Sequence, residues 1–308
     1  MDADEDLTLT QEFLALRFEE QRGHLRAVAY RMLGSLSEAD DAVQEAWMRL
    51  SRSDTSDVHN LAGWLTTVVG RVCLDMLRSR ASRREEPLDV RVPDPIVSRE
   101  EGIDPEHEAL LADSVGLALL VVLETLAPAE RLAFVLHDLF AVPFDEIAPI
   151  VGRTPTAARQ LASRARRRVQ GSAAARDADQ SRQREIVEAF MAAARGGDFE
   201  GLLALLDPDV TLRADTGVLT PAFARGASVN RFVTGAREVA DQAYTFHRLA
   251  RFARLVLVNG LPGIATAVDG APVAVMSFAV RDGKIVEIDV LADSDRLSRL
   301  DLAFLNDD

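Results

Sequence analysis

The spacing of apolar residues changes along this chain, and that change limits the folds open to it. From residue 11 to about residue 84 apolar residues recur every three or four positions, and the same spacing returns between Asp113 and about Val169, which predicts helices. Further on the pattern alternates, and Asp269-Gly270 and Asp282-Gly283 each separate two alternating runs. Asp-Gly between such runs indicates a β-hairpin. The sequence therefore predicts two all-α domains and an α+β domain with a curved antiparallel sheet.

These patterns divide the 308 residues into segments, in keeping with the two or three domains expected for this length. Residues 10–84 and 113–170 are expected to form the two helical domains, and residues 182–303 the α+β domain. Residues 85–112 contain several prolines and many acidic residues without periodicity, and are predicted to be a linker. Inside the last domain we expect two helices at its start, a helix at 229–239 and a long strand at 247–258.

The charge of the chain is unevenly distributed. The formal net charge of -14 argues, taken alone, against a nucleic-acid partner. Residues 147–176, however, contain seven arginines and no acidic residue. A contact with a phosphate is local, because salt screens charges beyond about 10 Å, so a basic element can bind DNA inside an acidic chain. Nucleic-acid binding is therefore expected of this segment.

The arginine-rich segment has the sequence pattern of a helix-turn-helix. A short expected helix ends at Gly152, Thr154 is placed as an N-cap, and Pro155 stands at the first position of a second helix. In this motif the first turn of the second helix reaches base edges in the major groove. The candidate base-reading residues are Thr156, Arg159 and Gln160, and the candidate phosphate-binding residues are Arg164, Arg166, Arg167 and Arg168. The alternative is an ordinary helical hairpin with a solvated basic face.

A second expected helix, at residues 39–50, has one apolar and one polar face. Val43 and Trp47 lie on the apolar side, whereas Asp41, Gln44 and Glu45 lie on the other. Taken alone, this pattern indicates only an amphipathic helix at the surface of a helical domain.

Three stretches in one order resemble the extracytoplasmic-function (ECF) sigma factors, which are specificity subunits of bacterial RNA polymerase. Residues 24–34 with 41–47 resemble the helices of sigma region 2 that dock on the polymerase β′ clamp. Residues 62–80 resemble the part that reads the −10 element, and residues 123–168 resemble region 4. The resemblance implies promoter-specific transcription initiation. A cytoplasmic location is expected from the single cysteine and from the lack of a basic region before a long apolar run at the start of the sequence. The implied partners are core RNA polymerase, through the β′ clamp and the β flap, and promoter DNA, as −35 duplex and melted −10 element.

The resemblance also assigns roles to single residues. Contact with core polymerase is implied for Asp41, Gln44, Glu45 and Trp47, with Trp47 mostly supporting the core. Contact with the −10 DNA is implied for Asn60, Trp64, Arg71, Arg78 and Arg80.

The C-terminal part resembles the SnoaL-like, NTF2-type domain found behind the sigma domains in the SigJ-type group. Residues 91–95, 215–219 and 292–297 correspond to three motifs that this group usually carries. The resemblance implies a fused regulatory domain. Residues 177–308 carry a formal charge of -6 and residues 114–176 one of +3, so we also expect this tethered domain to pack against the helical domains. The candidate regulatory residues are Asp215, Gly217, Asp293, Asp295 and Arg296.

A rival interpretation makes the chain a SnoaL-like enzyme or a small-ligand sensor with a helical DNA-binding module. Acid–base groups for such an enzyme would come from Asp215, Tyr244, His247 and Asp289. No sequence pattern couples them into an acid–base pair, so we expect no enzymatic activity. The sequence neither predicts nor excludes a small ligand in the C-terminal pocket.

Several other site classes are not expected. Cys73 is the single cysteine, which excludes an intramolecular disulfide, and its apolar helix face suggests a core thiol. We expect no metal or cofactor, because the histidines lack the spacing that zinc requires; these are His24, His59, His107 and His137. The longest nearly unbroken apolar run, 115–123, is under half the roughly 20 residues of a membrane-spanning helix. No membrane partner is expected.

Overall fold

The computed structural model describes residues 3–52, 60–82, 92–99, 116–171, 180–216 and 232–306. The chain divides into two compact units. The first consists of the described parts of Met1–Pro87, Glu108–Asp113 and Leu123–Arg168, and the second of those of Leu88–His107, Ser114–Val122 and Val169–Asp308. Within the described residues, every helix is too short or too polar to cross a membrane.

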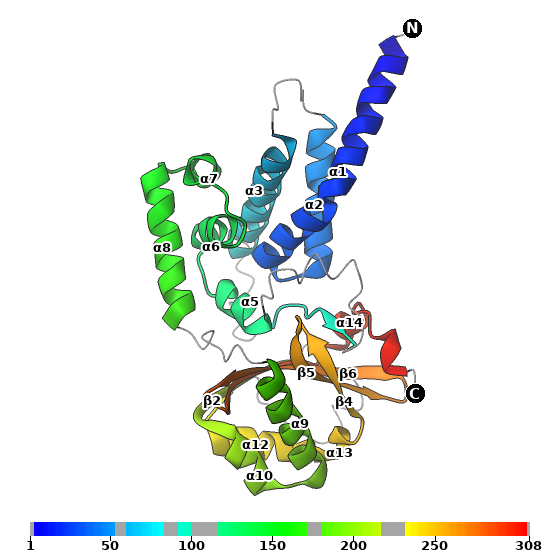
Figure 1. The fold of residues 1–308 in the computed structure, drawn as a ribbon, viewed down its shortest axis with the longest axis vertical. Coiled ribbons are helices and arrows are strands. Elements are labelled where there is room, and N and C mark those ends of the chain that lie inside the picture. Colours follow the sequence, from blue (N-terminus) through cyan, green and yellow to red (C-terminus); the bar gives the residue numbers. More distant parts are fainter. Residues whose placement is uncertain are drawn as a thin grey trace. The chain divides into compact units, whose positions relative to one another are not determined.

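The first unit begins with a bundle of three helices (Figure 1). These are α1 (Ala3–Leu33), α2 (Leu36–Leu50) and α3 (Leu61–Ser82). Gly34, with a φ of 67°, ends α1 and lets the chain reverse into α2. Apolar residues spaced three and four apart meet in a core in which Leu25, Val43 and Leu74 are fully buried.

The predicted helix-turn-helix is confirmed in the same unit. After α6 (Pro128–Phe134) and a π-helical turn, η1 (Val135–Leu139), α7 (Phe144–Val151) is joined to α8 (Pro155–Gly171). Gly152 has a φ of 65°, a left-handed conformation that glycine adopts without strain. Ala158, Ala162 and Ala165 are fully buried, so α8 packs through small residues and its arginines point outward.

The two helical parts pack together inside this unit. Gly70 of α3 faces Leu132 and Leu136, and a methyl group added there would lie 3.2 Å from the Leu136 side chain. Arg131 of α6, only 3% exposed, donates a hydrogen bond from Nη1 to the carbonyl of Met32 at 2.8 Å. The predicted domains 10–84 and 113–170 therefore contribute to one compact unit.

The second unit is built on a seven-stranded sheet with the order β1-β4-β5-β6-β7-β2-β3. The expected antiparallel sheet is wrong in one respect, because β2 runs parallel to β7 and the sheet is mixed. The two Asp-Gly hairpins are confirmed, with Asp269 and Asp282 at φ of 51° and 53°. The strands are β1 (Val97–Ser98), β2 (Leu206–Asp215), β3 (Phe232–Thr234), β4 (Ala253–Val258), β5 (Leu261–Val268), β6 (Ala271–Arg281) and β7 (Lys284–Leu291).

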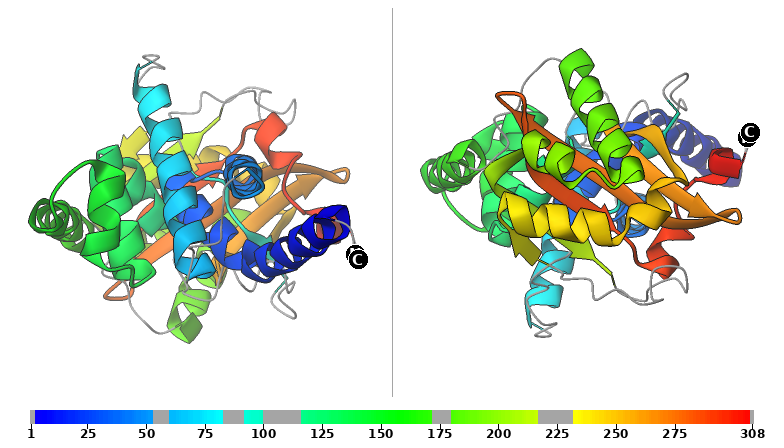
Figure 2. Two further views of the ribbon diagram at one scale, coloured as in Figure 1. Left: turned by 90° about the horizontal axis from the view of Figure 1, so that it is seen from above. Right: turned by 90° about the horizontal axis from the view of Figure 1, so that it is seen from below.

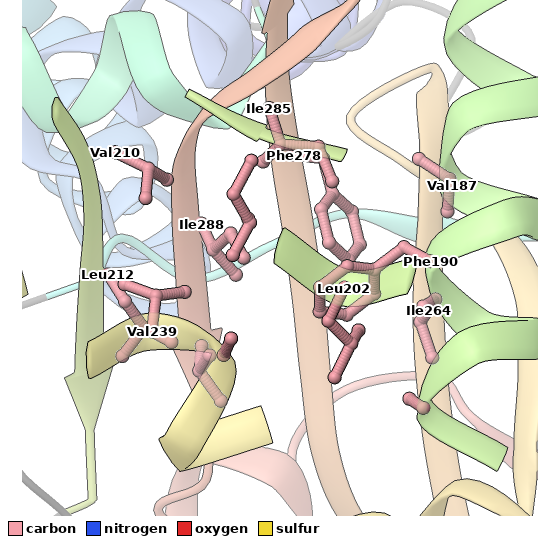
Figure 3. Close-up of a cluster of buried hydrophobic side chains, with 14 of the residues drawn as sticks. Val187, Phe190, Leu202, Val210, Leu212, Val239, Ile264, Phe278, Ile285 and Ile288 are labelled. Atoms are coloured by element: carbon pink, nitrogen blue, oxygen red, sulfur yellow. The ribbon is translucent and has the colours of Figure 1, made fainter. Parts of the chain in front are cut away.

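Helices cover one face of this sheet (Figures 1 and 2), which confirms the α+β plan. The core between the two layers contains Phe190 and Phe278, whose rings meet edge to face at 5.3 Å, above Leu202 (Figure 3). The covering helices are α9 (Gln180–Gly196), α10 (Phe199–Leu205), α12 (Ala236–Thr245) and α13 (His247–Ala250). The unit also contains most of α5 (Leu117–Glu124), α14 (Ser294–Leu297) and η2 (Ala303–Asn306).

Two expected elements in this unit are wrong. In the described part of the helix expected at 229–239, residues 232–234 form a strand, because Gly235 turns the chain at a φ of 102° and the helix starts at Ala236. The strand expected at 247–258 starts only at Ala253, since His247–Ala250 forms a helical turn. Leu249 and Ala250 pack against the core from this helical turn.

Part of the predicted linker belongs to the sheet. Val97 pairs with Val258 of β4 and Ser98 with Leu257, and the backbone N–H of Ile96 donates to Oδ1 of Asn259 at 3.0 Å. Val92, Ile96 and Val97 are buried. The acidic composition of the segment predicted a linker, but this short apolar run within it is an edge strand of the second unit.

Candidate functional site

The polar face of α2 presents the residues predicted to bind polymerase. Asp41 and Gln44 are exposed, and Glu45 forms a salt bridge with Arg49 one turn later at 2.9 Å. Trp47 is half-buried and its ring lies 5.1 Å from that of Phe18, so it supports the bundle as expected. This leaves Asp41 and Gln44 as the polar groups of the face best placed to meet a partner.

Asn60 holds the start of α3. Its Oδ1 accepts a hydrogen bond from the backbone N–H of Gly63 at 3.0 Å, which is the geometry of an N-cap. The resemblance implies a base contact for Asn60, and an Asn that ends a polar stretch before a helix is also typical of an N-cap. Both roles are compatible, because the exposed side chain still has its amide N–H groups.

The other residues predicted to contact the −10 DNA lie on α3. Trp64 and Arg71 line an open groove, whose opposite wall is formed by Glu146, Pro149 and Ile150 of α7. Arg78 is exposed, whereas Arg80 forms an ion pair with Glu38 of α2. Sequence reasoning missed two further basic residues of this groove, Arg49 and Arg52, which stand at and beyond the end of α2 and lack a motif of their own.

The first turn of α8 is exposed. Thr154 caps it, accepting a hydrogen bond at Oγ1 from the backbone N–H of Ala157 at 3.3 Å. Thr156, Arg159 and Gln160 all face solvent, and the Arg159 guanidinium lies 5.3 Å from the centre of the Phe144 ring. A capped helix start with exposed arginine and glutamine has the donors that read base edges in a major groove.

The four arginines further along α8 differ in their surroundings. Arg164 and Arg168 both pair with Glu130, at 3.1 and 3.0 Å, and Arg166 donates from Nε to Asp138 at 2.8 Å. Arg167 is exposed and makes no ion pair within the residues that the structure covers. The sequence treated all four as equivalent, because it does not show which carboxylates fold against them.

Arg296 joins three segments that lie far apart in the sequence. Its Nε donates to Asp94 at 2.8 Å, its Nη1 to Asp215 at 2.5 Å, and its Nη2 to the carbonyl of Val92 at 2.6 Å. The three side chains are 14–18% exposed. Described residues of the three stretches singled out in the sequence, Val92, Asp94 and Asp215, thus meet at the guanidinium of Arg296.

The remaining predicted regulatory residues take other places. Asp293 is the N-cap of α14, accepting from the backbone N–H of Arg296 at 2.9 Å, and thereby fixes the start of the turn that carries Arg296. Asp295 is exposed. Gly217 lies outside the described residues.

A cavity of about 90 Å³ lies between the covering helices and the sheet. Four of its lining residues are Phe190, Leu212, Ile264 and Ile288, labelled in Figure 3. Gln242 and Thr266 supply the polar side chains, and none of the described residues that line it carries a charge. At ~24 cal/mol per Å³, an unfilled apolar space of this size costs about 2 kcal/mol of stability.

The acid–base candidates do not line this cavity. Along β2 and β7 the cavity residues alternate with Asp215 and Asp289, which therefore project from the opposite face of the sheet. Asp289 is 1% exposed and accepts a hydrogen bond from Arg213 at 3.0 Å. Tyr244 is exposed and its ring stacks on that of His247 at 5.2 Å.

Arg213 is held by two carboxylates, those of Asp289 and Glu287, on that opposite face. Burial alone would lower the pKa of Arg213, but the two neighbouring carboxylates outweigh it and raise that pKa. No sequence pattern indicates this network, since its members are 74 and 76 positions apart.

The described part of the chain contains neither a candidate metal site nor an accessible thiol. No group of three or more metal-ligating side chains occurs there. Cys73 is fully buried, and burial raises the pKa of its thiol far above the usual value.

Two segments of the chain match known protein families. They correspond to the helical bundle and to the helix-turn-helix with its exposed basic face. Residues 18–83 match Sigma-70 region 2, and residues 116–169 match Sigma-70, region 4. These matches and this geometry define a sigma factor, a class of transcription initiation factor.

Whole-chain relatives narrow the class. The ECF RNA polymerase sigma factor SigJ of Mycobacterium tuberculosis is 40% identical over 91% of this chain and 92% of its own. The probable ECF RNA polymerase sigma factor SigI of the same species is 36% identical over 91% and 93%. The crystal structure of M. tuberculosis SigJ superimposes with a TM-score of 0.73, at 36% identity, over 94% of this chain and 99% of that one. The chain belongs to the ECF RNA polymerase sigma factors.

Proposed function

We propose that the two units divide the work of promoter-specific transcription initiation. The polar face of α2 binds core RNA polymerase at its β′ clamp, the groove beside Trp64 binds the melted −10 element, and α8 binds the −35 duplex. The observation that carries the proposal is the exposed first turn of α8, where a capped helix presents Thr156, Arg159 and Gln160 together. The protein acts in the cytoplasm, where core polymerase is found.

The polymerase contact is tested by reversing charge on α2. Asp41→Lys with Glu45→Lys is expected to weaken association with core enzyme at least tenfold, since exposed Asp41 and half-exposed, Arg49-paired Glu45 lie on the face proposed to meet basic groups on the clamp. The matched control, Glu200→Lys with Asp241→Lys, changes the net charge equally on exposed positions of α10 and α12. Unchanged affinity of the first variant in a titration with core enzyme would contradict the assignment.

The second unit acts as a regulatory domain without chemistry of its own. Its support is the convergence of segments 92–94, 215 and 296 on one guanidinium, together with a cavity whose described lining has no titratable group. We expect that truncation after Arg176 changes transcription from a promoter selected from genomic DNA. Arg296→Ala in the full chain serves as the milder test, because truncation also uncovers Ile96 and Val97.

The rival function, a SnoaL-like enzyme, makes the opposite prediction. If the second unit were catalytic, Asp215→Ala or His247→Ala would abolish conversion of a small molecule while leaving transcription intact. We expect no conversion by the wild-type protein. Detection of such a conversion by the purified chain would overturn the regulatory assignment.

A further inference from the structure

The cavity of the second unit is built by small side chains. Six of its lining residues are alanine, and they come from α9, β2, α12, α13, β4 and β6: Ala194, Ala214, Ala243, Ala250, Ala253 and Ala274. A larger residue at almost any of these positions would fill the space. The void therefore results from many separate positions and not from one poorly packed side chain.

The lining sets the chemistry of an occupant. Its described side chains are apolar except for Gln242 and Thr266, so a charged molecule would lose its hydration without gaining a counter-ion. Water is also a poor occupant, because apolar cavities of comparable size stay dry. A neutral molecule with at most one or two hydrogen-bonding groups meets these conditions.

The size of the cavity sets the scale of that molecule. A cavity of roughly 150 Å³ accommodates benzene in another protein. Here the volume is about 90 Å³, and Met191 and Met276, both half-buried, are flexible thioethers that can move to admit one ring. A peptide segment or a fused-ring molecule would require a much larger space.

We propose that the cavity between α9, α12, α13 and the sheet binds one small neutral molecule, with a single aromatic or aliphatic ring and one hydrogen-bonding group. Gln242 and Thr266 are the described lining residues with a side-chain hydrogen-bonding group, and Phe190 and Phe246 supply aromatic surface for the ring. Binding joins α12 and α13 to the sheet. An effect of the ligand on transcription rests on the proposed regulatory role of this unit, whereas the binding itself does not.

Two probes with the same carbon skeleton test the site in the full-length chain: benzyl alcohol, which is neutral, and benzoate, which is an anion. Calorimetric titration is expected to show saturable one-site binding of benzyl alcohol, and saturation should raise Tm by about 2–4 °C. Benzoate is expected to give neither effect. Equal binding of both probes, or no saturable binding of benzyl alcohol up to its solubility limit, would overturn the proposal.

Variants locate the binding. Ala250→Leu, on half-buried α13, is expected to fill the cavity and weaken binding at least tenfold, and Ala243→Leu on α12 gives an independent measurement if the first variant folds poorly. The control Ala192→Leu makes the same change on the exposed side of α9 and is expected to bind like wild type. Wild-type affinity in both cavity variants would place the ligand elsewhere and refute the proposal.

Transcription with core polymerase separates the site from its regulatory effect. A change in transcript yield on adding benzyl alcohol, absent in Ala250→Leu, would support both. Binding without any change in yield would support the site and contradict an effect of the ligand on transcription, whereas the regulatory role of the unit is tested separately by truncation and by Arg296→Ala.

Discussion

The helix-turn-helix and the cluster of Asp94, Asp215 and Arg296, here called the Arg296 junction, present their functional groups in different ways. On α8, Thr156, Arg159 and Gln160 lie within one helical turn and a half and are exposed because Ala158 and Ala162 take the buried side. At the junction, Asp94, Asp215 and Arg296 are brought together from positions 81 and 202 residues apart. The first arrangement depends on local periodicity, and the second depends on the whole fold of its unit.

The largest effect on stability is expected from the substitution of Arg296. Arg296→Ala leaves the carboxylates of Asp94 and Asp215, both mostly buried, without their shared cation, and breaking such a pair costs about 3 kcal/mol. Urea unfolding is expected to show this loss in the transition of the second unit. Arg299→Ala, at an exposed position of the same segment, serves as control and should change stability by less than about 0.5 kcal/mol.

Substitutions on α8 should affect DNA binding more than stability. If Arg159 reads a base, Arg159→Ala is expected to cost about 1–3 kcal/mol on the specific −35 site and to relax its sequence preference. Arg167→Ala should weaken binding to all DNA similarly and reduce the salt slope by about one, as expected for a phosphate contact. Identical specificity profiles of the two variants would contradict base reading by Arg159.

Asn60 belongs to the local kind of arrangement, and its substitution is expected to have a smaller effect. Asn60→Ala removes the cap of α3 and should lower stability by about 1 kcal/mol, whereas Asn60→Ser retains a capping oxygen and should cost only a few tenths. If the amide also reads a base, both variants impair promoter opening more than −35 binding. Equal losses of Asn60→Ala on opening and on −35 duplex would indicate a defect of folding instead.

The smallest effect concerns Cys73. Burial raises the pKa of this thiol and thereby disfavours the nucleophilic thiolate, so iodoacetamide at neutral pH should not modify the native protein. Modification, followed by mass spectrometry, is expected only in urea concentrations that unfold the first unit. Rapid labelling without urea would show that α3 opens locally.

The same contrast explains what the sequence alone could predict. The helix-turn-helix followed from Gly152, Thr154 and Pro155, because caps and turns are encoded by neighbouring residues. The segments that meet at Arg296 were found by resemblance, but their pairing depends on how the sheet places them. The parallel pairing of β2 with β7 was missed for a similar reason, since strand direction is set by the connections and not by alternation.

The two tryptophans of this chain, Trp47 and Trp64, both lie in the first unit. Trp47 packs against Phe18, and Trp64 lines the groove beside α7, so the two report different parts of one unit. Intrinsic emission excited at the red edge of the protein spectrum therefore observes the helical unit alone. Any spectral shift that follows an event in the second unit would be a direct optical readout of communication between the units, obtained without a label.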